Sequence, residues 1–251
     1  MLFRSRYVSL THFGHNHFGD SSVAKGEYGP EVEPHNNGVS DIGRQLIHKM
    51  NGLGIMVDVS HTSKEATLQA VALSKTPVIA SHSGVKAVYD HPRNLSDEEI
   101  KAIALAGGVV QLVAFDSYMR PISKAEKTAQ LAVRERLGLA ASDWYKHASQ
   151  TQVHQKRIQT NALSAQWPRA TVGNLVDHID HVVALVGIEH AGIASDFGGG
   201  GGVQGWGSID QTPAVTAELV RRGYKPTDIQ KIWSGNLLRV WQAAEDYANA
   251  N

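Results

Sequence analysis

Short runs of apolar, mostly β-branched residues recur along the chain and alternate with segments of helical spacing. Each run is too short for a helix and too continuously apolar for a strand with a solvated face, which favours strands buried in a parallel sheet. The pattern predicts five strands, at residues 6–12, 55–61, 77–82, 109–115 and 191–196. The segments between them have room for helices, so the chain reads as a series of β-α units.

Helix start signals fit this alternation. A residue with a capping side chain stands before each of four amphipathic segments, namely Ser40, Ser63, Ser96 and Thr171. Ser96 with Glu99 has the spacing of a capping box. Further helices are predicted after Pro213, from Thr227, and from Gly235 to the end of the chain.

Residues 118–168 interrupt the rhythm. The segment is polar, has helix-forming stretches such as Ala125–Leu137, and carries no strand signal. We expect a helical insertion over one end of the sheet, within a single domain that spans residues 1–251. The predicted fold class is α/β, a (β/α)8 TIM-barrel-like fold, of which only about five of the eight units are found. The barrel is therefore expected to be incomplete.

Composition narrows the function. The chain has 251 residues, of which 42% are hydrophobic, and its formal net charge of 0 argues against a nucleic-acid partner. No apolar run has the length of a membrane span or of a secretory signal. The compartment stays open, with the cytoplasm as the default. Since there are no cysteines, histidines and carboxylates are the strong metal ligands available.

Four of the five predicted strands end on a polar group, at His12, His61, His82 and Asp196. Active sites of β/α barrels lie at these strand ends. Neutral imidazole and carboxylate are the ligands of zinc in hydrolytic sites, where the metal makes hydroxide available at neutral pH. Asp196 could ligate the metal, orient water or move a proton. Arg93, on the loop after the second histidine strand, could bind a substrate carboxylate.

Other clusters have simpler explanations. His15 and His17 lie in a polar loop and are expected to be structural or incidental. The acidic and histidine residues at 177–181 fit the polar face of an amphipathic helix. The serines beside the histidines lack a Gly-x-Ser-x-Gly elbow, and the glycines at 198–202 lack the spacing of a phosphate-binding loop.

The order of the motifs resembles the membrane dipeptidase family, also called the renal dipeptidase family or peptidase family M19. The resemblance runs over nearly the whole chain. Its motifs are Arg6-Tyr7-x-x-Leu10-Thr11-His12, Gly54-x-x-x-Asp58-x-Ser60-His61, Pro77-x-Ile79-x-Ser81-His82-Ser83, Arg93-Asn94, Gly107-Gly108-Val109-Val110, Gly192-Ile193-x-Ser195-Asp196-Phe197 and Asn236-Leu237-Leu238-Arg239-Val240.

The resemblance implies a metallo-dependent hydrolase barrel in which two zinc ions, bridged by water and a glutamate, hydrolyse dipeptides. His61 and His82 then ligate one zinc, and Asp196 sits at the other and transfers a proton. His12 polarises the scissile carbonyl or stabilises the tetrahedral intermediate, and Arg93 holds the C-terminal carboxylate of the dipeptide.

The chain also departs from the family pattern. The family's His-x-Asp ligand pair and bridging glutamate lie upstream of the strand that matches residues 6–12, and Asp-Phe-Asp-Gly is replaced by Asp196-Phe197-Gly198-Gly199. Three interpretations stay open: a dipeptidase that lacks its N-terminal part, a non-catalytic relative with a binding or scaffold role, and a one-metal amidohydrolase. Two, one or no zinc ions are compatible with them. A periplasmic location fits a chain that lacks its N-terminal part, and an exposed sheet edge predicts a homodimer or an aggregation-prone chain.

Overall fold

The computed structural model describes residues 5–24, 33, 36–140 and 147–251, and its centre is a parallel sheet. Along the sheet the strands follow the order β1-β2-β3-β5-β6. They are β1 (Tyr7–Ser9), β2 (Met56–Asp58), β3 (Ile79–Val85), β5 (Val109–Val113) and β6 (Ala191–Ala194). All five predicted strands are thus confirmed, and each pairs in parallel with its neighbour. The two-residue β4 (Asn94–Leu95), which was not predicted, pairs with the end of β3.

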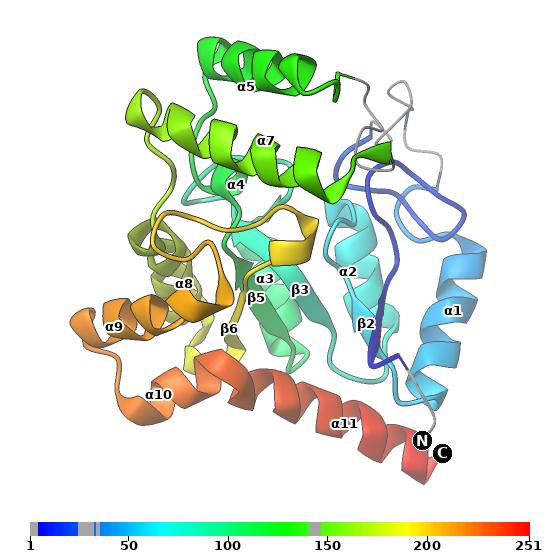
Figure 1. Ribbon diagram of the computed structural model, residues 1–251. Helices are drawn as coiled ribbons and strands as arrows, with labels where there is room; N and C mark the ends of the chain where they lie inside the picture. Colours follow the sequence, from blue (N-terminus) through cyan, green and yellow to red (C-terminus); the bar gives the residue numbers. More distant parts are fainter. Residues whose placement is uncertain (1–4, 25–32, 34–35, 141–146) are drawn as a thin grey trace.

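Helices follow the strands and pack against the sheet (Figure 1). They are α1 (Asp41–Gly52), α2 (Lys64–Leu73), α3 (Asp97–Leu105), α8 (Val172–Val186), α9 (Pro213–Arg221), α10 (Pro226–Gln230) and α11 (Asn236–Ala250). The four predicted N-caps are confirmed, because the side chains of Ser40, Ser63, Ser96 and Thr171 each accept a backbone N–H of the first turn. None of the helices in the described ranges is both long and apolar enough to cross a membrane.

Two apolar clusters hold the sheet and the helices together. The larger one joins strand residues such as Val57 and Val110 to Ile47 of α1, Ile103 of α3 and Ile179 of α8, all of them fully buried. The smaller one lies at the N-terminal ends of the strands, where α11 runs across the sheet (Figure 1). Burial of these side chains supplies the main drive for docking the helices. The candidate site lies at the other end of the sheet, at the C-terminal ends of the strands.

The predicted helical insertion is confirmed. It contains α4 (Asp116–Met119), α5 (Lys124–Arg136) and α7 (Gln150–Ala162), and α5 and α7 lie over the C-terminal end of the sheet (Figure 1). Arg120 anchors the start of this insertion, because its guanidinium donates two hydrogen bonds to the carboxylate of Asp116 and two to that of Glu126. Bidentate pairs of this kind fix geometry as well as charge. The insertion therefore has a defined attachment beside the strand ends.

The sheet has two edges, β1 and β6, and in the described ranges no pairing joins them into a closed barrel. The parallel strand order and the outer helices agree with the predicted α/β fold of incomplete TIM-barrel type.

Candidate functional site

Three of the predicted histidines meet at the C-terminal end of the sheet. His12 follows β1, His61 follows β2, and His82 lies in β3, so parallel pairing brings them to the same edge. The ring centroids of His12 and His61 are 4.4 Å apart, and those of His61 and His82 are 4.9 Å apart. The Nε2 atoms of His61 and His82 face each other at 2.9 Å. The strand-end prediction holds for this row of imidazoles.

Local backbone geometry orients the side chains of His61 and His82 toward each other. His61 has a φ of 72°, in the left-handed region that non-glycine residues rarely adopt and that is common at functional sites. In β3 the register shifts between Ala80 and Ser83, a bulge-like irregularity that re-aims side chains. The N–H of His82 donates to Ser60 Oγ at 2.9 Å instead of continuing the ladder.

A buried carboxylate that the sequence analysis did not single out organises this region. Asp58 at the end of β2 is fully buried. Its Oδ1 accepts the backbone N–H groups of Ser60 (3.0 Å) and Ser81 (2.8 Å). Its Oδ2 accepts the hydroxyls of Ser9 (2.5 Å) and Ser81 (2.6 Å). Ser81 Oγ also lies 2.6 Å from Nδ1 of His82. Asp58 therefore connects β1, β2 and β3 directly behind the histidine pair.

The histidine pair is held in its neutral form. Burial lowers the pKa of His61 to about 2, and the charge of Arg93 acts in the same direction. Burial also lowers the pKa of His82, although the negative charges of Asp58 and Asp196 oppose the shift. Neutral imidazole is the form that binds a metal. Two neutral rings whose Nε2 atoms converge fit two ligand positions of one divalent ion such as zinc.

Arg93 is a buried cation beside this pair. Its side chain is almost fully buried, and its Nη2 donates to the carbonyl of His82 at 3.0 Å. The guanidinium carbon lies 5.4 Å from the ring centroid of Tyr118, a cation–π distance, and Nε has no hydrogen-bond partner. Within the described ranges no carboxylate forms an ion pair with Arg93. Burial lowers the pKa of Arg93, and Tyr118, Asp58 and Asp196 offset this shift only in part. A guanidinium with no ion-pair partner among the described residues therefore favours an anionic ligand.

A cleft of about 320 Å³ opens beside these groups, and both His61 and Arg93 line it. Its other walls come from Ser21, Ser22, residues 62–65, Lys86, Asp90, Pro92 and residues 94–96 with Glu99. A larger and more open hollow, of about 450 Å³, lies between α8 and α9 and contains none of the predicted site residues. The chemistry locates the candidate site in the smaller cleft.

Asp196 stands apart from the histidine pair at the same end of the sheet. It follows β6 with a φ of 51°, and its carbonyl accepts the N–H groups of Gly199 (3.0 Å) and Gly201 (2.7 Å). Its charge opposes the lowering of the pKa that burial causes at both His82 and Arg93. In the described ranges, no three His, Asp or Glu side chains form a group that could hold a metal ion. The role of Asp196 as a ligand stays a prediction.

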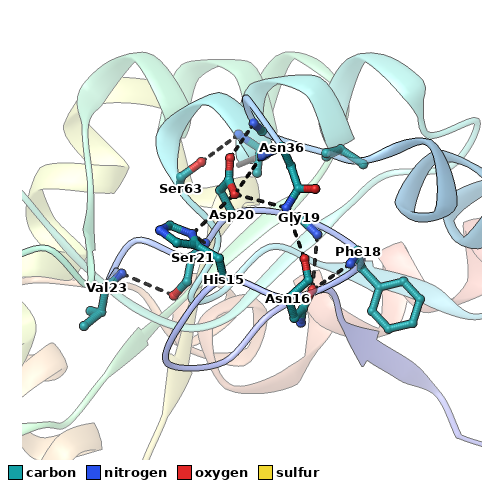
Figure 2. Close-up of polar contacts among 12 residues, drawn as sticks. His15, Asn16, Phe18, Gly19, Asp20, Ser21, Val23, Asn36 and Ser63 are labelled. Atoms are coloured by element: carbon teal, nitrogen blue, oxygen red, sulfur yellow. Dashed lines mark hydrogen bonds and ion pairs between the residues drawn. The ribbon is translucent and has the colours of Figure 1, made fainter. Parts of the chain in front are cut away.

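The loop after β1 ties His12 to His61. Ser21 Oγ lies 2.6 Å from the carbonyl of His12 and 3.1 Å from that of His61, and the N–H of Ser22 donates to His61 at 2.8 Å. Figure 2 shows the polar contacts that Asp20 makes within this loop, with the ring of His15 beside its carboxylate. Burial alone would raise the pKa of Asp20, but hydrogen bonds from Gly38 and Asn36 lower it. His15 is thus structural, as expected.

The charged residues of α8 bind separate structural partners. Asp177 and Asp180 both bind Arg222, and His181 bonds Asp97. His178 is an exception to the predicted polar face, because it is fully buried and its Nδ1 accepts the N–H of Val85 at 2.8 Å. These groups are structural and do not converge on one ligand.

Sequence comparison identifies relatives. The pattern of the family described as membrane dipeptidase (peptidase family M19) matches residues 4–251. An uncharacterized dipeptidase from Schizosaccharomyces pombe is 29% identical over 247 residues, 98% of this chain and 48% of that protein. The dipeptidase verJ from Clonostachys rogersoniana is 29% identical over 242 residues, 96% of this chain and 49% of that protein. The chain thus spans about half the length of these curated relatives.

Solved structures with a similar fold include a probable dipeptidase and a metallo peptidase. The probable dipeptidase PvdM from Pseudomonas aeruginosa superposes with a TM-score of 0.77 at 36% identity, covering 97% of this chain and 63% of that structure. A metallo peptidase from Rhodobacter sphaeroides, liganded with a phosphinate mimic of the dipeptide L-Ala-D-Ala, superposes with a TM-score of 0.62 at 24% identity, covering 92% and 52%. The second likeness concerns the fold alone.

Proposed function

The chain belongs to the membrane dipeptidase family, peptidase family M19, and from this premise we propose that it is a zinc-dependent dipeptidase. The observation that carries the proposal is the facing of His61 and His82, whose Nε2 atoms are 2.9 Å apart beside a cleft. The neutral state of both rings fits metal ligation. Asp196 is proposed as a further ligand or proton carrier at the same strand ends.

Arg93 is proposed to select the substrate. A dipeptide carries a free carboxylate close to its scissile bond, and the guanidinium of Arg93, whose Nε has no hydrogen-bond partner, can donate two parallel hydrogen bonds to it. Because Arg93 and His61 line the same cleft, a molecule bound through its carboxylate extends toward the histidines. Tyr118, which makes the cation–π contact with Arg93, itself stacks on Phe115 with ring centroids 4.3 Å apart.

His12 and Asp196 complete the proposed chemistry. A bound zinc ion supplies a water of lowered pKa and an electrophile for the carbonyl. His12, whose ring centroid lies 4.4 Å from that of His61, is proposed to donate a hydrogen bond to the carbonyl oxygen as charge develops there. Asp196 is proposed to carry the proton to the leaving amine. The burial of His61 limits the access of bulk water to the pair.

The purified chain with added zinc tests the proposal. We expect stoichiometric metal, hydrolysis of dipeptides followed by amine release, and inhibition by a phosphinate dipeptide mimic, whose tetrahedral phosphorus resembles the intermediate. His61→Ala and His82→Ala are expected to lose both metal and activity. His48→Ala, which removes an exposed histidine from α1, is the matched control and should retain both. Wild-type chain with a folded spectrum but no bound zinc contradicts the proposal.

A second candidate is binding without turnover. It is favoured by one observation, that the described ranges hold no group of three metal-ligating side chains. In that case the chain binds a dipeptide through Arg93 and does not cleave it. Calorimetric titration with a dipeptide, followed by product analysis of the same sample, separates the two: binding with intact dipeptide supports the second candidate, and free amino acids support the first.

A further inference from the structure

The hydrogen bonds around Asp58 determine where the protons of its neighbours lie. A carboxylate that receives four hydrogen bonds acts purely as an acceptor. The hydroxyl of Ser81, 2.6 Å from Oδ2, must therefore donate its single proton to Asp58. No proton of Ser81 is then left for its other neighbour, the ring of His82.

The ring of His82 must supply the proton for that second contact. Ser81 Oγ and His82 Nδ1 are 2.6 Å apart, and with the hydroxyl proton committed to Asp58 only an Nδ1–H of His82 can bridge them. A neutral imidazole has one N–H, so Nε2 of His82 keeps its lone pair. That lone pair points at His61, because the two Nε2 atoms are 2.9 Å apart.

His61 has the opposite arrangement. Its Nε2 must donate to the lone pair of His82, which leaves its Nδ1 as an acceptor, and this buried Nδ1 has no hydrogen-bond partner. A buried acceptor without a partner is less unfavourable than a buried N–H without one, so the assignment is consistent around the pair. One ring is ready to bind a metal through Nε2, whereas the other must first move its proton.

We infer that Asp58 and Ser81 are positioning residues that fix the tautomer of His82, so that its Nε2 lone pair is directed to the shared point before any metal binds. The tautomer stands on the hydrogen bonds alone, and its consequence for metal affinity rests on the proposed function. Outer partners of metal-binding histidines set ring orientation and ligand basicity in this way. Here the carboxylate acts through an intervening serine hydroxyl.

Nitrogen NMR of metal-free chain labelled with ¹⁵N-histidine tests the tautomer directly. We expect a protonated Nδ1 and an unprotonated Nε2 for His82, identified by loss of its signals in His82→Ala. Ser81→Ala should change this pattern, and Ser81→Thr, which keeps the hydroxyl, should restore it. Ser83→Ala is the matched control, because Ser83 is also a serine of β3 but its hydroxyl pairs with Ser60 at 3.1 Å and not with Asp58 or the ring of His82. A protonated Nε2 on His82 in the wild type overturns the inference.

Zinc affinity, measured by competition with a chromophoric chelator, tests the consequence. Loss of an outer partner weakens metal binding by about 10- to 100-fold, and we expect this of Ser81→Ala and Asp58→Asn but not of Ser83→Ala. Equal affinities for wild type and Ser81→Ala overturn the link to the metal. If the wild type binds no zinc at all, the proposed function and that link both fail, while the spectrum still decides the tautomer. If zinc binds as expected without hydrolysis, only the proposed function fails.

Discussion

A single methyl group at position 199 is expected to displace the carboxylate of Asp196. A Cβ built on Gly199 would lie 2.3 Å from Oδ1 and 2.9 Å from Cγ of Asp196. At the neighbouring Gly198, a Cβ would meet nothing within 4 Å, and neither glycine has a positive φ. Gly199→Ala and Gly198→Ala are therefore a matched pair: both add one methyl group to the same turn, and only the first one reaches the carboxylate.

The size of the effect follows from the geometry. Ordinary contacts begin near 3.4 Å, so the carboxylate must retreat from the new methyl group by about 1 Å. A misplacement of about 1 Å in a catalytic group costs roughly 100-fold in rate, or about 3 kcal/mol in the activation free energy. Since a carboxylate can rotate away, the free energy of unfolding should fall by no more than about 1–3 kcal/mol.

The assay compares kcat/KM for a dipeptide at saturating zinc, with thermal unfolding of each variant as the control for folding. We expect a roughly 100-fold loss for Gly199→Ala and near wild-type activity for Gly198→Ala. Equal activities of the two variants would refute the reasoning, because the position of Asp196 would then not limit the rate. A loss of activity in both variants would instead show that the conformation of the whole turn, and not only the position of the Asp196 carboxylate, limits the rate.

Three further outcomes are expected. Arg93→Met should raise KM for dipeptides about 30-fold, as expected for the loss of a buried charge contact worth about 2 kcal/mol, and should leave the weak binding of the corresponding dipeptide amides unchanged. Since the pKa of Asp20 is lowered in the folded state, its contribution is present above about pH 4 and is lost as the pH falls through the lowered pKa. Asp20→Asn should therefore destabilise the chain by about 1–3 kcal/mol at pH 7, measured by urea unfolding, and by progressively less as the pH falls below about 4; a pH-independent difference would contradict this. Light scattering should give a homodimer, because β1 is an edge strand whose Tyr7 is 48% exposed, and a monomer at all concentrations would contradict it.

Much of the fold was readable from local signals. Continuous apolar runs gave the strands, and side-chain caps gave the starts of four helices, because both depend on nearby residues. The short β4 had no such signal, since its two residues pair only with the end of β3. The strand predicted at 55–61 pairs only over Met56–Asp58, because the chain bends at His61 toward the site.

The candidate site was readable only in part. The histidine pair follows from the rule that parallel strands end together, so its residues could be named from the sequence. Asp58 was visible as a charge inside an apolar run, but its partners Ser9 and Ser81 depend on strand register and on the irregularity in β3. Tyr118 reaches Arg93 only because the insertion folds back over the strand ends. Contacts of this kind are set by tertiary packing and leave no local pattern.

The two sides of the candidate site are held in different ways. Asp58 and the bulge-like shift in β3 fix His61 and His82 through partly buried hydrogen bonds between neighbouring strands. Asp196 is held by the backbone of a glycine-rich turn, where small residues permit its left-handed conformation and the close approach of Gly199. A network of buried polar groups resists displacement, whereas an exposed turn yields at lower free energy. If Asp196 acts as a proton carrier, changes in the turn should alter the rate with little effect on zinc affinity, whereas a matching loss of zinc affinity would identify Asp196 as a ligand; changes behind the histidine pair should alter both rate and affinity.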